Sequence, residues 1–278
     1  MNKIFCLLAA AVLVASSAWA EDINLVADEK VEWYQNENKM VAVGNAVASK
    51  KDLSVRGDTI TAYYDSVKAP GGEKAKSRIK TVHARGGVIM KSPRATGFGD
   101  TLDYDVVKDT MFLNGRPAKI KTAEETITST GGITYYLTEQ KAVATGEVIA
   151  SDKENKIYSD KMVSYFTKNA EGNLEMERVE IFGHVKIVTP TAVANSERGI
   201  YLPKEAKVRL FDDVVLNQDG SLLKGDYAET DLNTGISRML MKKGSGKRVS
   251  GVFKEKKKEN KPAAAAPDAE KDTDNDKQ

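Results

Sequence analysis

The chain has 278 residues, 41% of them hydrophobic, and its 42 basic and 40 acidic residues leave a formal net charge of +2. A single cysteine, Cys6, excludes a disulfide framework. Only two histidines, His83 and His184, are present, so a structural zinc site is not expected either. We expect no metal, no cofactor and no nucleic acid partner.

Residues 1–20 have the pattern of a secretory signal peptide. Lys3 precedes an apolar segment, residues 4–14, and a small-x-small sequence ends at Ala20. The apolar segment is too short for a stable membrane span. We therefore expect cleavage after Ala20 and export of the remaining chain.

A pattern of alternating apolar residues then recurs about six times between residues 23 and 240. Residues two and four positions before the centre of each unit are apolar, and the phase resumes after it in most units. Such alternation is typical of strands with one buried face, and its repetition indicates stacked β units, each predicted to contain two or three short strands. Each centre is predicted to be a turn between two strands, and the centres are Gly44, Gly86, Gly115, Gly146, Gly183 and Asp212.

The spacing inside the units is also regular. A second glycine or serine, predicted to form another turn, follows the centre by thirteen residues at Gly57, Gly99, Ser159, Ser196 and Gly225. In the third unit the interval is fourteen, and Pro117 predicts a bulge there, because proline cannot donate a ladder hydrogen bond. The sequence predicts an all-β fold of antiparallel strands over residues 21–241, whose inward face is buried either by packing two sheets together or by coiling.

Residues 242–278 differ in composition from the β region. Residues 242–261 contain nine Lys or Arg against two Glu, and residues 262–278 combine an alanine run with five acids. Low hydrophobicity with blocks of charge is typical of disorder, so we expect a disordered tail. Two roles stay open for its basic part: attraction to an anionic lipid surface, or solvation that keeps the protein soluble.

Candidate catalytic patterns are weak. Ser77 and Lys80 have the spacing of a serine–lysine acylation pair but lack its partner motifs. Gly246 and Lys247 lack the remainder of a phosphate-binding loop. Gly-Asp pairs recur in register with the units, which favours turn chemistry over the paired carboxylates of a glycosidase. We expect no catalytic residue and no enzymatic activity.

The inward phase of the units is predicted to form an apolar interior. Many of its residues are alanine, and small side chains between sheets about 10 Å apart leave space that leucine or phenylalanine would fill. Such a groove would suit acyl chains; alternatively, larger side chains opposite the alanines close it. The candidate lipid-binding residues are Met40, Ala42, Ala46, Ala48, Tyr64, Val82, Ala84, Val88, Met90, Met111, Leu113, Ala142, Ala144, Val148, Ala150, Phe166, Val179, Ile181, Val185 and Ile187.

Residues 40–48 (MVAVGNAVA) and 56–65 (RGDTITAYYD) resemble a known family. They are similar to the OstA-like domain of the LptA family of periplasmic lipopolysaccharide-transport proteins. The pattern is matched most closely at 31–66 and again at 82–106 and 139–166, and the later copies are looser. The resemblance implies a periplasmic β-jellyroll that holds the acyl chains of the lipid A moiety. It also implies head-to-tail self-association through edge strands, in a bridge from the inner-membrane lipopolysaccharide export complex to the outer-membrane translocon.

The leading hypothesis is therefore a non-enzymatic conduit that carries lipopolysaccharide for outer-membrane assembly. A structural or adhesive β-solenoid of the periplasm or cell surface, with a filled core, is the alternative, and a polysaccharide-modifying enzyme is a third. Unpaired sheet edges are templates for strand addition. Residues 34–43 and 208–239 are expected to form the two ends.

Overall fold

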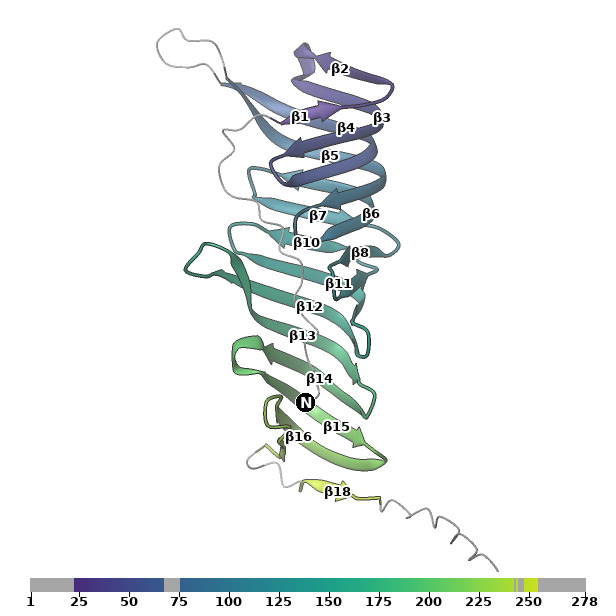
Figure 1. Ribbon diagram of the computed structural model, residues 1–278, viewed down its shortest axis with the longest axis vertical. Helices are drawn as coiled ribbons and strands as arrows, with labels where there is room; N and C mark the ends of the chain where they lie inside the picture. The colour runs from purple at the N-terminus through teal and green to yellow at the C-terminus, as the bar shows by residue number, and fades with distance from the viewer. Residues whose placement is uncertain (1–22, 68–75, 243, 245–247, 255–278) are drawn as a thin grey trace, which may run out of the picture.

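The computed structural model describes residues 23–67, 76–242, 244 and 248–254. The expected signal peptide and most of the expected tail (243, 245–247 and 255–278) lie outside the described residues. The described strands stack into one elongated body, with β1 and β2 at one end and β17 and β18 at the other (Figure 1). None of its helical segments is long and apolar enough to cross a membrane.

The secondary structure of this part is almost entirely β. Two short 3-10 turns, η1 (Gln35–Glu37) and η2 (Pro203–Glu205), connect strands. The strands are β1 (Asn24–Val26), β2 (Lys30–Tyr34), β3 (Lys39–Lys50), β4 (Leu53–Val67), β5 (Lys76–Lys91), β6 (Thr96–Asp105), β7 (Thr110–Asn114), β8 (Ala118–Lys121), β9 (Thr126–Ser129), β10 (Ile133–Tyr136), β11 (Lys141–Ser151), β12 (Lys156–Lys168), β13 (Leu174–Val188), β14 (Ala192–Leu202), β15 (Lys207–Gln218), β16 (Ser221–Asp231), β17 (Ser237–Leu240) and β18 (Ser250–Val252).

Long strands pair antiparallel with their neighbours in the chain, from β3 to β6 and from β11 to β16. Elsewhere two short strands take the place of one long strand, as β7 and β8 do beside β6 and β9 and β10 do beside β11. We call each long strand, or each such pair, a rung. The gap between β7 and β8 contains Pro117, so the bulge expected there is an interruption of the strand.

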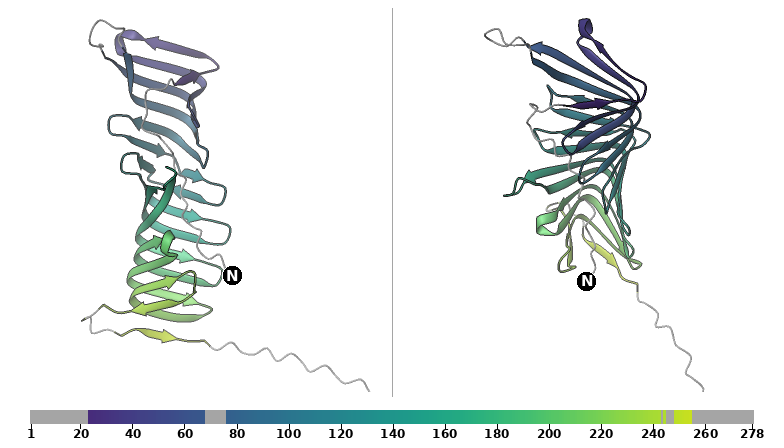
Figure 2. Two further views of the ribbon diagram at one scale, coloured as in Figure 1. Left: turned by 60° about the vertical axis from the view of Figure 1, so that its left-hand side comes forward. Right: turned by 45° about the horizontal axis from the view of Figure 1, so that its top comes forward.

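Most long strands bend near the middle, where the ladder shifts register. In β3 the bend lies at Gly44 and Asn45, with φ angles of 84° and 43°. The turn predicted at Gly44 is therefore a bend inside one strand. Gly183 and His184 form the same pair of positive-φ residues in β13. A bulge in this conformation bends a strand, so the two halves of the strand belong to two facing sheets. Figure 2 shows the strands folded over along the length of this β-jellyroll.

The strands are longer than the sequence predicted, and most units contain two of them. The second turn signal does not reverse the chain, because Gly57 lies inside β4 and Gly225 inside β16. Both lie opposite a bend: Gly57 pairs with Ala46, and Gly225 with Val214. A Cβ atom on Gly57 would lie 3.0 Å from the backbone oxygen of Arg85. The prediction that the strands are short was therefore wrong, although two strands per unit lie within the two or three expected. Small residues recur at these positions because the bend leaves little room.

The sheet extends past residue 241, where the sequence placed the end of the β domain. β18 lies in the segment expected to be tail, and it pairs with Leu222–Lys224 of β16. β17 pairs with the other half of β16. Together β17 and β18 complete the last rung of the described stack.

The chain contains two copies of one larger unit. Met40 pairs with Ala62, and the residues 102 positions further along, Ala142 and Ser164, pair in the same register. The order and pairing of β1 to β4 recur in β9 to β12. The second copy therefore continues the stack directly from the first.

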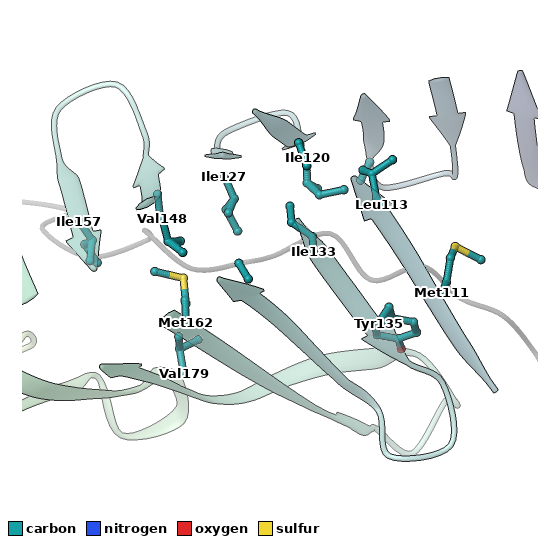
Figure 3. Close-up of a cluster of buried hydrophobic side chains, with 14 of the residues drawn as sticks. Met111, Leu113, Ile120, Ile127, Ile133, Tyr135, Val148, Ile157, Met162 and Val179 are labelled. Carbon is teal, nitrogen blue, oxygen red and sulfur yellow. The ribbon is translucent and has the colours of Figure 1, made fainter. Parts of the chain in front are cut away.

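The interior between the sheets is filled in the middle of the molecule. Buried side chains from β7 to β13 point toward one another (Figure 3), and Val148 and Met162 are only 1% and 2% exposed. Burial of each large apolar side chain contributes about 1.5–3 kcal/mol to folding. We call this cluster the central core; it comprises Met111, Leu113, Ile120, Ile127, Ile133, Tyr135, Val148, Ile157, Met162 and Val179.

Replacing a bend glycine is expected to destabilise this fold. In Gly183→Ala the new Cβ would lie 2.2 Å from Oδ2 and 2.9 Å from Cβ of Asp160, at a φ of 74°. The Asp160 carboxylate is held by Nδ1 of His184, 2.8 Å away. We expect the free energy of unfolding to fall by about 3 kcal/mol, from the left-handed backbone and the clash together.

Gly172→Ala is the matched control, because its φ of 80° is similar but nothing lies within 4 Å of the new Cβ. We expect it to cost about 1 kcal/mol, from the backbone conformation alone. Urea unfolding of both variants measures the difference. An equal loss of unfolding free energy in both variants would show that crowding at Gly183 adds nothing to the cost of the substitution.

Candidate ligand-binding interior

The candidate lipid-binding positions lie on the inner face, as their alternation predicted. Sixteen of the twenty are buried. The remaining four are half-buried: Met40, Ala48, Val82 and Ala142. Three of these, Met40, Ala48 and Val82, line a cavity. Burial does not by itself assign a ligand, so contact with lipid stays a prediction for all twenty.

A cavity of about 360 Å³ lies between the two sheets near the first end of the stack, and we call it the N-terminal cavity. Its inner wall is apolar and includes Ile60, Ala62 and Leu102. Among its lining residues, Lys51 and Pro93 are exposed, which places its mouth between the β3–β4 and β5–β6 hairpins. A cavity of this volume is within the range of small-ligand sites.

Apart from the charged hairpin residues at its mouth, the N-terminal cavity is lined by one ionisable side chain. Tyr104 lines it and is 4% exposed. Burial raises the pKa of the Tyr104 hydroxyl far above its usual range, and the carboxylates of Asp109 and Asp105 add to this shift. The hydroxyl is therefore neutral at physiological pH, which suits an apolar ligand.

A smaller cavity of about 140 Å³, the C-terminal cavity, lies near the other end of the stack. Its wall includes Ile187, Val208 and Leu210, and polar side chains such as Gln218 contribute to its lining. The central core lies between the strands that line the two cavities. The sequence left open whether the interior is open or filled, and the structure shows space near the ends and packing in the middle.

A comparison of the two copies explains why space occurs in the first. Three residues that line the N-terminal cavity, Ile23, Leu53 and Ile60, correspond to Glu125, Asn155 and Met162. All three counterparts are buried; in the first copy Ile60 is buried as well, but Ile23 and Leu53 are only half-buried. Nδ2 of Asn155 donates a hydrogen bond of 3.0 Å to Oδ2 of Asp152, and this bond fixes the buried Asn155 side chain at its hairpin. The corresponding region of the second copy is therefore occupied by side chains.

The interior also opens at the first end of the stack. Val31 and Trp33 of β2 are 51% and 61% exposed, whereas their second-copy counterparts, Ile133 and Tyr135, are 9% and 5% exposed. The counterparts are covered because β10 pairs with β7 on one side and β11 on the other. β2 pairs only with β3 among the described strands. Nε1 of Trp33 donates a hydrogen bond to the hydroxyl of Tyr64.

The polar clusters of the described chain do not include a metal site. No group of three or more His, Cys, Asp or Glu side chains among the described residues could hold a metal ion. Each histidine instead contacts one aspartate: Nδ1 of His83 is 2.6 Å from Oδ1 of Asp103, and His184 contacts Asp160. Neither histidine lines either cavity.

Sequence reasoning missed the mouth of the N-terminal cavity. The missed residues include Leu25 of β1 and the hairpin residues Lys50, Lys51 and Asp52. The hairpin residues were missed because the prediction followed the alternation of apolar residues along the strands, which hairpin residues do not share. Comparing residues 102 positions apart would have exposed the difference between the two copies.

The bent antiparallel strands, the two facing sheets and the apolar interior with space near both ends define the class, an elongated β-jellyroll. The chain belongs to the family described as "LptA/(LptD N-terminal domain) LPS transport protein", which matches residues 25–141 and 134–236. These two matches agree with the two copies in the structure. No curated protein sequence matches the chain.

Solved structures similar to this chain include LptH, described as the LptA homologous periplasmic component of the conserved lipopolysaccharide transport device from Pseudomonas aeruginosa. The sequences are 13% identical, and the alignment covers 86% of this chain and 100% of LptH. The TM-score is 0.20.

Proposed function

We propose that this protein binds lipopolysaccharide in the periplasm and carries it from the inner-membrane exporter toward the outer-membrane translocon without catalysing a reaction. The observation that carries this proposal is the N-terminal cavity, which is apolar inside and reaches solvent at its mouth. Membership of a lipopolysaccharide-transport family supplies the ligand class. Each buried methylene is worth about 0.8 kcal/mol, so a fourteen-carbon chain represents on the order of 10 kcal/mol.

Head-to-tail self-association is part of the proposal. Val31 and Trp33 face inward, but no described strand covers them as β7 covers Ile133 and Tyr135 in the second copy. A rung supplied by another chain would cover them in the same way and would pair with the open edge of β2. The contact between β7 and β10 inside the molecule therefore shows what the contact between β2 and a rung of another molecule would be like.

Site-specific photocrosslinking tests lipid binding. A photoreactive residue in place of Met40, which lines the N-terminal cavity, is expected to form adducts with lipopolysaccharide in cells. The same residue in place of Thr61, on the outer face of the adjacent strand, is expected to form few. Absence of adducts at Met40, or equal yields at both positions, would remove the support for an internal site. Cell fractionation checks the periplasmic location.

The filled central core favours one other function, a structural or adhesive β-solenoid that holds no lipid. Extraction of the purified protein followed by mass spectrometry separates the two. The transport proposal expects co-purified acyl chains, whereas the solenoid expects none.

A further inference from the structure

Two adjacent lysines lie at the mouth of the N-terminal cavity. Lys50 ends β3 and is half-buried, and Lys51 follows it in the exposed hairpin. Both line the cavity together with Asp52, so the hairpin carries a net positive charge where the apolar wall meets solvent. Ser49 and Ser92 add hydroxyl groups to the same lining.

The second copy lacks this arrangement. The residues that correspond to Lys50, Lys51 and Asp52 are Asp152, Lys153 and Glu154, which give that hairpin a net negative charge. The positions behind the hairpin are filled in the second copy, by Asn155 and Met162 among others. Positive charge and internal space therefore occur together at this hairpin of the first copy, and both are missing at the corresponding hairpin of the second copy.

The C-terminal cavity does not share the positive charge. Of the residues that the structure places around it, the charged one is Asp231. The remaining polar residues in its lining are neutral, such as Thr189 and Gln218. Of these two cavities, only the N-terminal cavity has a lysine pair in its lining.

We propose that Lys50 and Lys51 bind a phosphate of the lipid headgroup while an acyl chain of the same lipid enters the N-terminal cavity. This inference rests on the proposed function and specifies that the mouth of the N-terminal cavity recognises the phosphate of the ligand. Lysine ammonium groups form charge-assisted hydrogen bonds with phosphate oxygens. The ligand is accordingly an anionic amphiphile whose phosphates lie close to its acyl chains, as they do in lipid A.

The test compares the affinity of the full chain for bisphosphorylated lipid A and for the same lipid after removal of both phosphates. The wild-type protein is expected to bind the phosphorylated form at least about tenfold more tightly. The Lys50→Gln/Lys51→Gln variant is expected to bind both forms equally, at the level of the dephosphorylated lipid. Lys153→Gln, at the corresponding hairpin of the second copy, is the matched control and should behave like the wild type.

Each outcome has a distinct meaning. If the wild type binds both lipids equally, or if the double variant discriminates as the wild type does, phosphate recognition by this hairpin is wrong while lipid binding stands. If neither lipid binds the wild type, the proposed function fails as well. Thermal unfolding of the double variant should match the wild type, and inorganic phosphate at the lipid concentration should not compete, because it lacks the acyl chain.

Discussion

The Ala62→Phe variant is expected to lose lipid binding at the N-terminal cavity while remaining folded. Ala62 is 5% exposed and lines the cavity between Met40 and Val82 of the adjoining strands. A benzyl group there takes the space of three to four methylenes of an acyl chain. At about 0.8 kcal/mol each, their loss amounts to about 3 kcal/mol, or roughly a hundredfold in affinity. Lipid titration of the purified protein measures this change.

Thr61→Phe is the control for this substitution. Thr61 precedes Ala62 in β4 and, in a strand, its side chain points to the opposite face. We expect it to leave lipid affinity unchanged, and both variants to unfold within a few degrees of the wild type. Unchanged affinity in Ala62→Phe would mean that acyl chains do not occupy this cavity.

Two aspartates on the open edge are expected to abolish end-to-end association. In the Val31→Asp/Trp33→Asp variant, a covering rung would have to bury two carboxylates in place of apolar side chains that are 51% and 61% exposed in the single chain. Each apolar side chain contributes about 1.5–3 kcal/mol when covered, and burial of an unpaired carboxylate adds a penalty. We expect association to weaken at least about a hundredfold, as measured by sedimentation over a concentration series.

Val107→Asp serves as the control for this second variant. Val107 is 74% exposed, but it lies in the hairpin between β6 and β7, away from the end of the stack. It should therefore leave sedimentation unchanged. Comparable weakening by both variants would show that association depends on general surface hydrophobicity and not on the β2 edge.

The inner face could be predicted from sequence because side chains alternate strictly along a strand. This rule placed positions as distant as Ala42 and Ile187 on the same face, and both are buried. The bends could not be told from turns, since glycine with positive φ serves both. The strand pairing distinguishes the two cases: Gly57 pairs with Ala46 of β3, so β4 continues through Gly57 as one strand.

The candidate site was less accessible than the fold. The apolar phase of the strands is the same where the interior is filled and where it has space, as at Met162 and Ile60. Volume depends on how side chains from several strands meet, which a single-strand pattern does not contain. The short period of the glycines also concealed the longer repeat of 102 residues that relates the two copies.

The duplication lowers the number of non-covalent joints that an assembly of given length would need. A molecule with two copies covers about twice the distance of a molecule with one, so a span of given length needs about half as many non-covalent joints. Each joint dissociates at its own rate, and the lifetime of an unbroken span shortens as joints are added. In the proposed end-to-end assembly, the covalent link from β8 to β9 would remove one such breaking point from every molecule.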